Sequence, residues 1–180
     1  MTAPKRLALE LGLVPVTAWH MNLRSVLSAA EWDHVRRLCY AENSYHCSAC
    51  GAAGRLECHE AWTWNFSSGV QRLDRLLALD GRCHAVAHSL RSMRLGGLDL
   101  AEPIIQHLMR VNGTNRGDTL AYVEREILLV RARSRRSWRL DISEVRLYGI
   151  EPDRTRVTLA PSPSGQNWWQ RLLGAVPSQT

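Results

Sequence analysis

Hydrophobic residues recur every three or four positions in three segments of the chain, which is the spacing of one buried helix face. The first segment covers residues 28–42, and Ser28 and Glu31 at its start have the spacing of a helix-capping box. The other two segments cover residues 101–111 and 118–133. We therefore predict a helix in each segment, with the last two following one another in the second half of the chain.

The part of the chain between the first two helices has a different pattern. Residues 56–66 (LECHEAWTWNF) are rich in aromatic side chains and are followed by Ser-Ser-Gly, which predicts a strand. Residues 70–79 are rich in leucine without a clear strand alternation, so the pattern assigns no element to them. A short helix is predicted over 83–93, and residues 138–148 alternate in part, which predicts a strand or an extended arm.

These elements divide the chain into four parts. They are an N-terminal arm and helix (1–43), a central unit (44–96), a helical C-terminal part of the same domain (97–150) and a loosely ordered tail (151–180). A chain of 180 residues is long enough to bury a sizeable core. We therefore expect an α+β domain in which a small strand-containing unit is embedded between N- and C-terminal helices.

Arginine dominates the charge of the chain. There are 23 Lys and Arg residues against 17 Asp and Glu, a net charge of +6, and Lys5 is the only lysine. Arginine presents a planar fork of donors to phosphate, so this balance favours a nucleic-acid partner, although genome composition can also replace lysine by arginine. The sequence has no apolar run of about 18 residues and no recognisable signal peptide, so we expect a soluble cytoplasmic protein that does not bind membranes.

Two pairs of residues with the same spacing predict a structural zinc site. Cys47 and Cys50 stand in a Cys-x-x-Cys-Gly turn, which aims two sulfurs at one metal. Asp80 and Cys83 repeat the spacing, and a carboxylate oxygen can take the place of a thiolate on zinc. We predict that these four residues bind Zn²⁺. Cys39 falls on the apolar face of the first predicted helix and is assigned to the core.

Two histidines predict a second metal site next to the first. His84 and His88 are one helical turn apart, so their imidazoles share a helix face on which one divalent metal can join them. The pair follows the first site directly and comes about 25 residues after Cys58-His59-Glu60. Four other histidines have no partner pattern and are assigned structural or surface roles: His20, His34, His46 and His107.

Together these motifs resemble the ββα-metal unit of HNH endonucleases. In that unit a zinc knuckle, a strand that ends in a histidine, and a second knuckle leading into a histidine-bearing helix follow one another, which matches residues 46–95. The segments ECHEAW and CHAVAH resemble more narrowly a bacterial HNH-like subfamily, over residues 15–149. The resemblance implies an α+β fold with a structural zinc and an endonuclease that hydrolyses phosphodiester bonds in DNA with a divalent metal.

The resemblance also implies roles for single residues. His59 would be the general base that takes a proton from the attacking water. Cys58, His84 and His88 would bind the catalytic metal, which is Zn²⁺, Mg²⁺, Mn²⁺ or Ni²⁺. In an alternative arrangement His59, His84 and His88 are the three metal ligands and Glu60 is the base.

The sequence departs from the family pattern at two positions. The middle asparagine of the HNH motif, which braces the loop of the base, falls at Arg75, and Gln71 is a substitute from a nearby position. Arg75 is therefore included among the catalytic positions. Asp80 stands where the second knuckle has a cysteine. Both departures favour the alternative of a catalytically inactive, zinc-stabilised module that binds nucleic acid or another partner.

Arginines are predicted to contact the backbone of DNA or RNA. Five are crowded into residues 131–139 beside a tryptophan, and three more, Arg72, Arg75 and Arg82, lie between the halves of the metal motif. For the crowded group, a solvated helix end is the alternative interpretation. The predicted nucleic-acid-binding residues are Arg72, Arg82, Arg131, Arg133, Arg135, Arg136 and Arg139.

Overall fold

The computed structural model describes residues 7–89 and 101–152. The fold is mixed α/β, with a small three-stranded sheet and helices. In the described ranges, no helix is both long enough and apolar enough to cross a membrane. In chain order the elements are η1 (Val16–Ala18), α1 (Leu23–Val26), α2 (Ala29–Glu42), β1 (Leu56–Asn65), β2 (Val70–Asp80), α3 (Gly81–Ala87), α5 (Ala101–Asn112), α6 (Arg116–Arg133), β3 (Arg139–Asp141) and η3 (Ser143–Tyr148).

The sheet is built on a long hairpin. β1 and β2 pair antiparallel, from Leu56 with Asp80 at the open end to Asn65 with Val70 at the turn. A β-bulge at Asp74 of β2 shifts the register once. β3 adds to the first residues of β2 as a short parallel strand, which gives the order β1-β2-β3.

Residues 70–79, which show no clear strand alternation in the sequence, form most of β2. Leu73, Leu76 and Leu79 are all buried, the first two in one core and the third in another. A strand that is covered on both faces reads as a continuous apolar run without alternation. The bulge at Asp74 also interrupts the two-residue alternation of side chains along β2.

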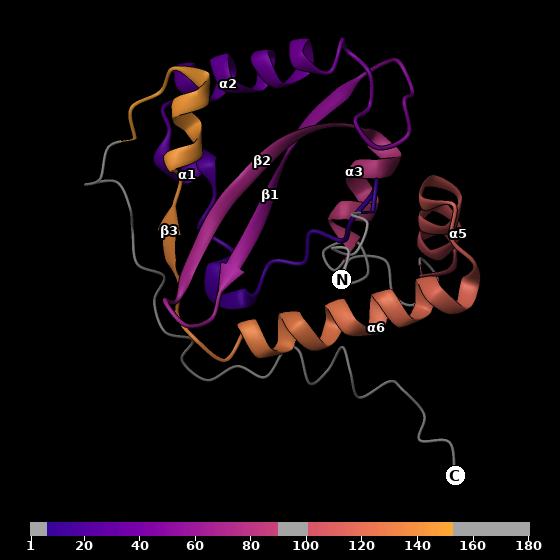
Figure 1. Ribbon diagram of the computed structural model, residues 1–180. Coiled ribbons are helices and arrows are strands. Elements are labelled where there is room, and N and C mark those ends of the chain that lie inside the picture. Colours follow the sequence, from indigo (N-terminus) through magenta and orange to yellow (C-terminus); the bar gives the residue numbers. More distant parts are fainter. Residues whose placement is uncertain (1–6, 90–100, 153–180) are drawn as a thin grey trace, which may run out of the picture.

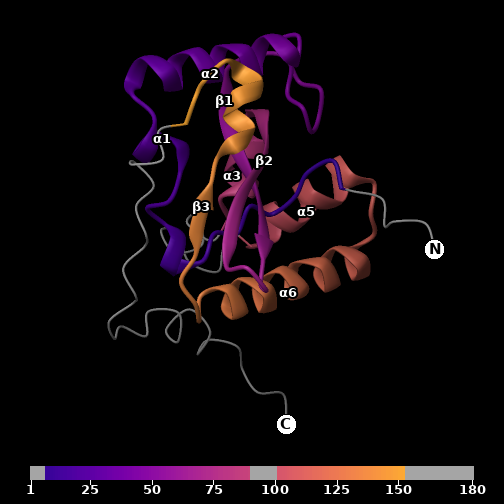
Figure 2. The same ribbon diagram turned by 60° about the vertical axis from the view of Figure 1, so that its left-hand side comes forward.

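Alternating residues of the hairpin pack into two separate cores. Cys58, Leu76 and Ala78 belong to the core with α2 and η3, whereas Leu77 and Leu79 belong to the core with α3, α5, α6 and the N-terminal segment. α2 and α6 lie on opposite sides of the hairpin (Figures 1 and 2). The hairpin is therefore the middle layer, and strand alternation decides which core each side chain enters.

The long predicted helices are confirmed. α2 begins after Ser28, which forms the predicted capping box with Glu31. α5 matches its predicted range to within one residue. α6 begins at Arg116, two residues before the predicted start, because the Asn115 side chain accepts a hydrogen bond from the backbone amide of Asp118 (2.9 Å).

α3 is shorter than predicted and begins earlier. Asp80 caps it by accepting hydrogen bonds from the backbone amides of Arg82 (2.7 Å) and Cys83 (2.9 Å), so the helix starts directly after β2. The helix ends at Ala87. The last predicted residues of this helix (90–93) and the predicted tail from 153 onward lie outside the described residues.

Residues 7–14 belong to the part predicted as an N-terminal arm, and they join three helices. Backbone groups of this segment bond to α5, α6 and α3 in turn. The contacts are Leu9 with Asn112 (2.8 and 2.9 Å), Leu11 with the hydroxyl of Tyr122 (2.7 Å) and Gly12 with the carbonyl of Ala87 (2.9 Å).

Candidate metal centres

The first candidate metal centre begins with a tight turn before β1. His46 pairs with Ala53 in a single β-bridge, and the backbone amide of Gly51 bonds to the carbonyl of Cys47 (2.9 Å). Gly51 has φ +75°, which favours glycine. The backbone amide of Ser48 bonds to the carbonyl of Ala78 in β2 (2.7 Å), so the turn is fixed against the sheet.

The end of β2 and the start of α3 complete this centre. Asp80 uses Oδ1 to cap α3, while its Oδ2 lies 2.8 Å from the sulfur of Cys50. Burial opposes ionisation of Asp80, but the Cys50 thiol and the backbone amides of Cys83 and Arg82 outweigh it and lower its pKa to about 2. The ligand atoms of Cys47, Cys50, Asp80 and Cys83 all lie within 4.8 Å of one another.

This donor set fits a zinc ion. A tetrahedral ion with bonds of about 2.3 Å needs sulfurs roughly 3.8 Å apart. Cys47 and Cys83 are buried and Cys50 is exposed. Burial and the neighbouring Cys47 raise the pKa of the Cys83 thiol, so a metal ion that bound here would have to displace its proton. Four protein ligands leave no open coordination position, which is typical of a structural site.

The second candidate metal centre consists of three histidines from two elements. His59 lies on β1, and His84 and His88 lie at α3 and its C-cap. Their ligand nitrogens are all within 4.8 Å of one another, and Nδ1 of His59 is 3.1 Å from Nε2 of His88. Three nitrogens bound to one zinc ion at about 2.05 Å would be roughly 3.4 Å apart. The cluster can therefore hold a metal ion such as zinc.

His59 is the buried member of the cluster, with 5% of its surface exposed. Burial and the neighbouring His88 and His84 lower its pKa to about 3, so the ring is neutral and its nitrogens can act as ligands. On the other side of the ring, a Cβ atom added to Gly12 would lie 2.6 Å from Nε2. The N-terminal segment thus closes the side of His59 that faces away from His88.

Glu57 lies beside the cluster and was not predicted from the sequence. It is two residues before His59, so both side chains are on the same face of β1. Its Oε2 is 3.1 Å from Nδ1 of His84. A carboxylate at this place fixes the proton on Nδ1 and leaves Nε2 of His84 as the ligand nitrogen. Strand alternation was the signal that could have identified Glu57.

The structure does not bring Cys58 into the histidine cluster, so its assignment as a ligand of the second metal is wrong. Cys58 alternates with His59 and packs in the core on the α2 side, beside Cys39. A hydrogen bond with Cys39 and burial raise the pKa of the Cys58 thiol, which keeps it in its neutral form.

Glu60 lies on the face of β1 opposite His59, so the structure does not support its assignment as a base beside the metal. Its Oε1 accepts a hydrogen bond from the backbone amide of Leu23 (3.1 Å) at the start of α1. Burial raises the pKa of Glu60 to about 7. The carboxyl group therefore fastens α1 to the sheet.

Neither Arg75 nor Gln71 contacts the histidine cluster. Arg75 forms ion pairs with Asp74 (2.6 Å) and Glu10 (3.2 Å), and its side chain is 29% exposed. Gln71 is fully buried and donates a hydrogen bond to the carbonyl of Met21 (3.1 Å). The structure thus gives both residues partners elsewhere, and the predicted catalytic position of Arg75 is not supported.

Several of the predicted nucleic-acid-binding arginines are held against the turn of the hairpin. Arg136 donates to the carbonyl of Phe66 and lies over the rings of Phe66 and Trp138. Arg133 lies over Trp64 with 13% of its side chain exposed, and Arg139 donates to the carbonyl of Ser68 (3.3 Å). These contacts stabilise the turn.

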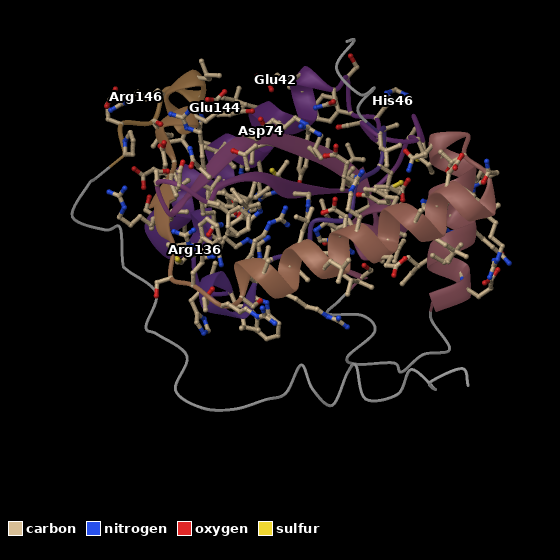
Figure 3. All side chains as sticks on the ribbon, turned by 60° about the horizontal axis from the view of Figure 1, so that its bottom comes forward. Glu42, His46, Asp74, Arg136, Glu144 and Arg146 are labelled. Atoms are coloured by element: carbon tan, nitrogen blue, oxygen red, sulfur yellow. The ribbon has the colours of Figure 1, made fainter. Side chains whose placement is uncertain are left out.

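The remaining predicted arginines are not held against the hairpin turn by any contact described for them. Arg72 pairs with Asp141 (2.9 Å), Arg131 is half-buried on α6, and Arg82 and Arg135 are exposed. The hairpin turn is seven residues beyond His59, which is about 23 Å along a strand. Figure 3 shows Arg136 at the end of the molecule opposite His46. The crowded arginines therefore do not border the metal centres.

The chain was compared with protein-family models, with curated proteins and with solved structures, and nothing matches in any of these comparisons.

We expect Glu60→Gln to stabilise the protein at pH 8 and to have little effect at pH 4.5. The folded-state pKa of about 7 is above the ordinary value of 4.5, so the wild-type protein loses stability as pH rises between these values. Glutamine keeps the acceptor for Leu23 without the charge, so the gain is at most about 3 kcal/mol. Urea unfolding of both proteins at pH 4.5 and pH 8 measures the difference in the free energy of unfolding. An equal difference at both pH values would contradict the raised pKa as its cause.

We expect Gly12→Ala to destabilise the protein by about 1–3 kcal/mol and to weaken metal binding by the histidines. The added Cβ would lie 2.6 Å from Nε2 of His59 and 3.3 Å from the carbonyl of Ala87, so the segment or the ring must move. Gly81→Ala is the matched control, because nothing lies within 4 Å of its added Cβ. Equal thermal stability and equal metal affinity in the two variants would refute this role of Gly12.

Proposed function

We propose that the protein is a metal-dependent phosphodiesterase that cuts DNA, in the manner of HNH endonucleases. Zinc at Cys47, Cys50, Asp80 and Cys83 has a structural role in this proposal, and a second divalent metal is held by the three histidines. The observation that carries the proposal is the convergence of His59, His84 and His88, with ligand nitrogens within 4.8 Å of one another.

The local architecture supports this proposal. A knuckle-like turn, an antiparallel hairpin and a short helix follow one another, and the histidines come from the first strand and the helix, as in the ββα-metal unit. The three-histidine arrangement, which was the alternative in the sequence analysis, is favoured over the one with Cys58. In it His59 is a ligand and not the base, because its Nδ1 faces His88 and its ring is buried.

Each residue of the cluster has a distinct part in the proposed reaction. His59 is the ligand on the buried side, and the half-buried His84 and His88 leave the solvent side for a phosphate group. Glu57 orients His84. A divalent metal bound here would polarise a phosphate oxygen and lower the pKa of a coordinated water. Arg82 is exposed directly before the Cys83–His84 pair and is our candidate for a phosphate contact.

The donor set narrows the choice of metal. Three imidazole nitrogens are suited to Zn²⁺ and Ni²⁺, whereas Mg²⁺ prefers oxygen ligands. We therefore expect the second centre to bind zinc or nickel more tightly than manganese, and magnesium most weakly.

An inactive zinc-stabilised module is the second candidate function. Two observations favour it: Glu60 lies on the far face of β1, and Arg75, at the asparagine position, is bound to Asp74 and Glu10. In this alternative the metal centres hold the fold together and nucleic acid or another partner binds without being cut.

We expect two zinc ions per chain in metal analysis of the purified protein. His84→Ala with His88→Ala lowers the count to one, because it removes two of three ligands from the second centre only. Cys47→Ser with Cys83→Ser lowers the count and also destabilises the fold, because the first centre joins the turn to α3. Removal of metal by a chelator is expected to lower the melting temperature. A wild-type protein without bound zinc would contradict both candidate functions.

We expect the zinc- or nickel-loaded protein to cut plasmid DNA or single-stranded oligonucleotides. His88→Ala lowers the cleavage rate at least a hundredfold, because the second metal loses a ligand. Glu60→Gln is the control, and it retains activity because Glu60 is on the other face of the sheet. A protein that holds two metal ions and cuts no DNA would favour the inactive module, and normal cutting by His88→Ala would exclude the proposed site.

A further inference from the structure

His107 is a buried histidine whose neighbours in the sequence show no metal-binding pattern. It lies on α5, is 8% exposed, and its Nε2 is 3.2 Å from the sulfur of Cys83. Its Nδ1 is 2.5 Å from Nη2 of Arg110, one helical turn further along α5. The ring thus lies between a guanidinium group and a sulfur of the first metal centre.

The neighbours of His107 determine which nitrogen carries the proton. A guanidinium group has only donors, so Nδ1 of a neutral His107 accepts from Arg110. The proton is then on Nε2, which donates toward the sulfur of Cys83. In this tautomer Nε2 has no lone pair for a metal, and His107 is not a ligand.

A hydrogen bond from Nε2 of His107 would offset part of the negative charge of the first centre when zinc is bound. Three thiolates and one carboxylate around Zn²⁺ carry a net charge of −2, and two of the sulfurs, those of Cys47 and Cys83, are buried. Buried charge that is not compensated is costly. The Asp80 carboxylate already accepts two backbone amides at the start of α3, whereas Cys83 receives its side-chain hydrogen bond from α5.

We propose that His107 is a positioning residue of the first metal centre: its Nε2–H stabilises the Cys83 thiolate, and Arg110 holds the ring in the tautomer that can donate. This proposal rests on the proposed zinc site. It adds that α5, which follows the hairpin–helix unit in the chain, contributes to metal affinity and is more than a cover for the sheet.

The test compares His107→Leu with His107→Gln in the full chain. Leucine fills the space without a donor, and glutamine returns an N–H group at the end of a side chain of similar reach. His34→Leu is a control for the loss of a histidine away from the first centre, because His34 is an exposed histidine on α2 that bonds to the carbonyl of Tyr148 (3.1 Å). Zinc affinity is measured by competition with a chromophoric chelator, and the site is also loaded with Co²⁺ for absorption spectroscopy.

We expect His107→Leu to bind zinc at the first centre about tenfold more weakly than wild type. The thiolate-to-cobalt charge-transfer band shifts, because Cys83 loses its hydrogen bond, while its intensity still corresponds to three thiolates. His107→Gln recovers most of the affinity, and His34→Leu has wild-type affinity and spectrum. Arg110→Met has a smaller effect in the same direction as His107→Leu.

Three results would overturn the proposal. Equal losses in His107→Leu and His107→Gln would point to a role in packing alone. Wild-type affinity in Asp80→Ala together with a loss of tetrahedral cobalt absorption in both His107 variants would make His107 the fourth ligand. Unchanged affinity and spectrum in His107→Leu would leave the histidine without a role. If the wild-type protein bound no zinc at all, the proposed function itself would fail, and that outcome is distinct from all three.

Discussion

The arrangement of the molecule depends on the two oxygens of Asp80. One accepts the first amides of α3 and the other faces the sulfur of Cys50, so a single carboxyl group sets the start of the helix and takes part in the first metal centre. α3 has seven residues, which is too short for a helix to be stable by itself. Because Asp80 also pairs with Leu56 at the open end of the hairpin, the register of the two strands determines how far His59 is from the helix.

The clusters could be predicted from the sequence because their ligands come in short motifs. Spacing alone placed Cys47 with Cys50 and His84 with His88, and the capping box fixed the start of α2. The surroundings of the two faces of β1 were harder to predict. Alternation separates Glu57 and His59 from Cys58 and Glu60, but both faces are covered by a core, so the run Glu-Cys-His-Glu does not show which face holds the metal centre. Arg75 shows a further limit, since its partner Glu10 is 65 residues away in the sequence.

The number of arginines in the sequence does not show where they lie in the structure. A net charge of +6 says that phosphate would be attracted to the molecule, but it does not say where. Arg133 and Arg136 lie over aromatic rings at the hairpin turn, and their planar, weakly hydrated groups suit this place. Part of the arginine preference therefore has a structural cause, which the crowding within residues 131–139 did not reveal.

The contacts of the N-terminal segment, residues 7–14, can form only late in the synthesis of the chain. Leu9 bonds to Asn112 and Leu11 to Tyr122, partners that are 103 and 111 residues later in the chain. Synthesis must therefore pass α5 and the first turns of α6, as far as Tyr122, before Leu9 and Leu11 can form these bonds. Gly12, which lies against the ring of His59, directly follows Leu11 in this segment. The histidine cluster, whose ligands end at residue 88, therefore receives its full cover only after a later part of the chain, α5 and the start of α6, has been synthesised.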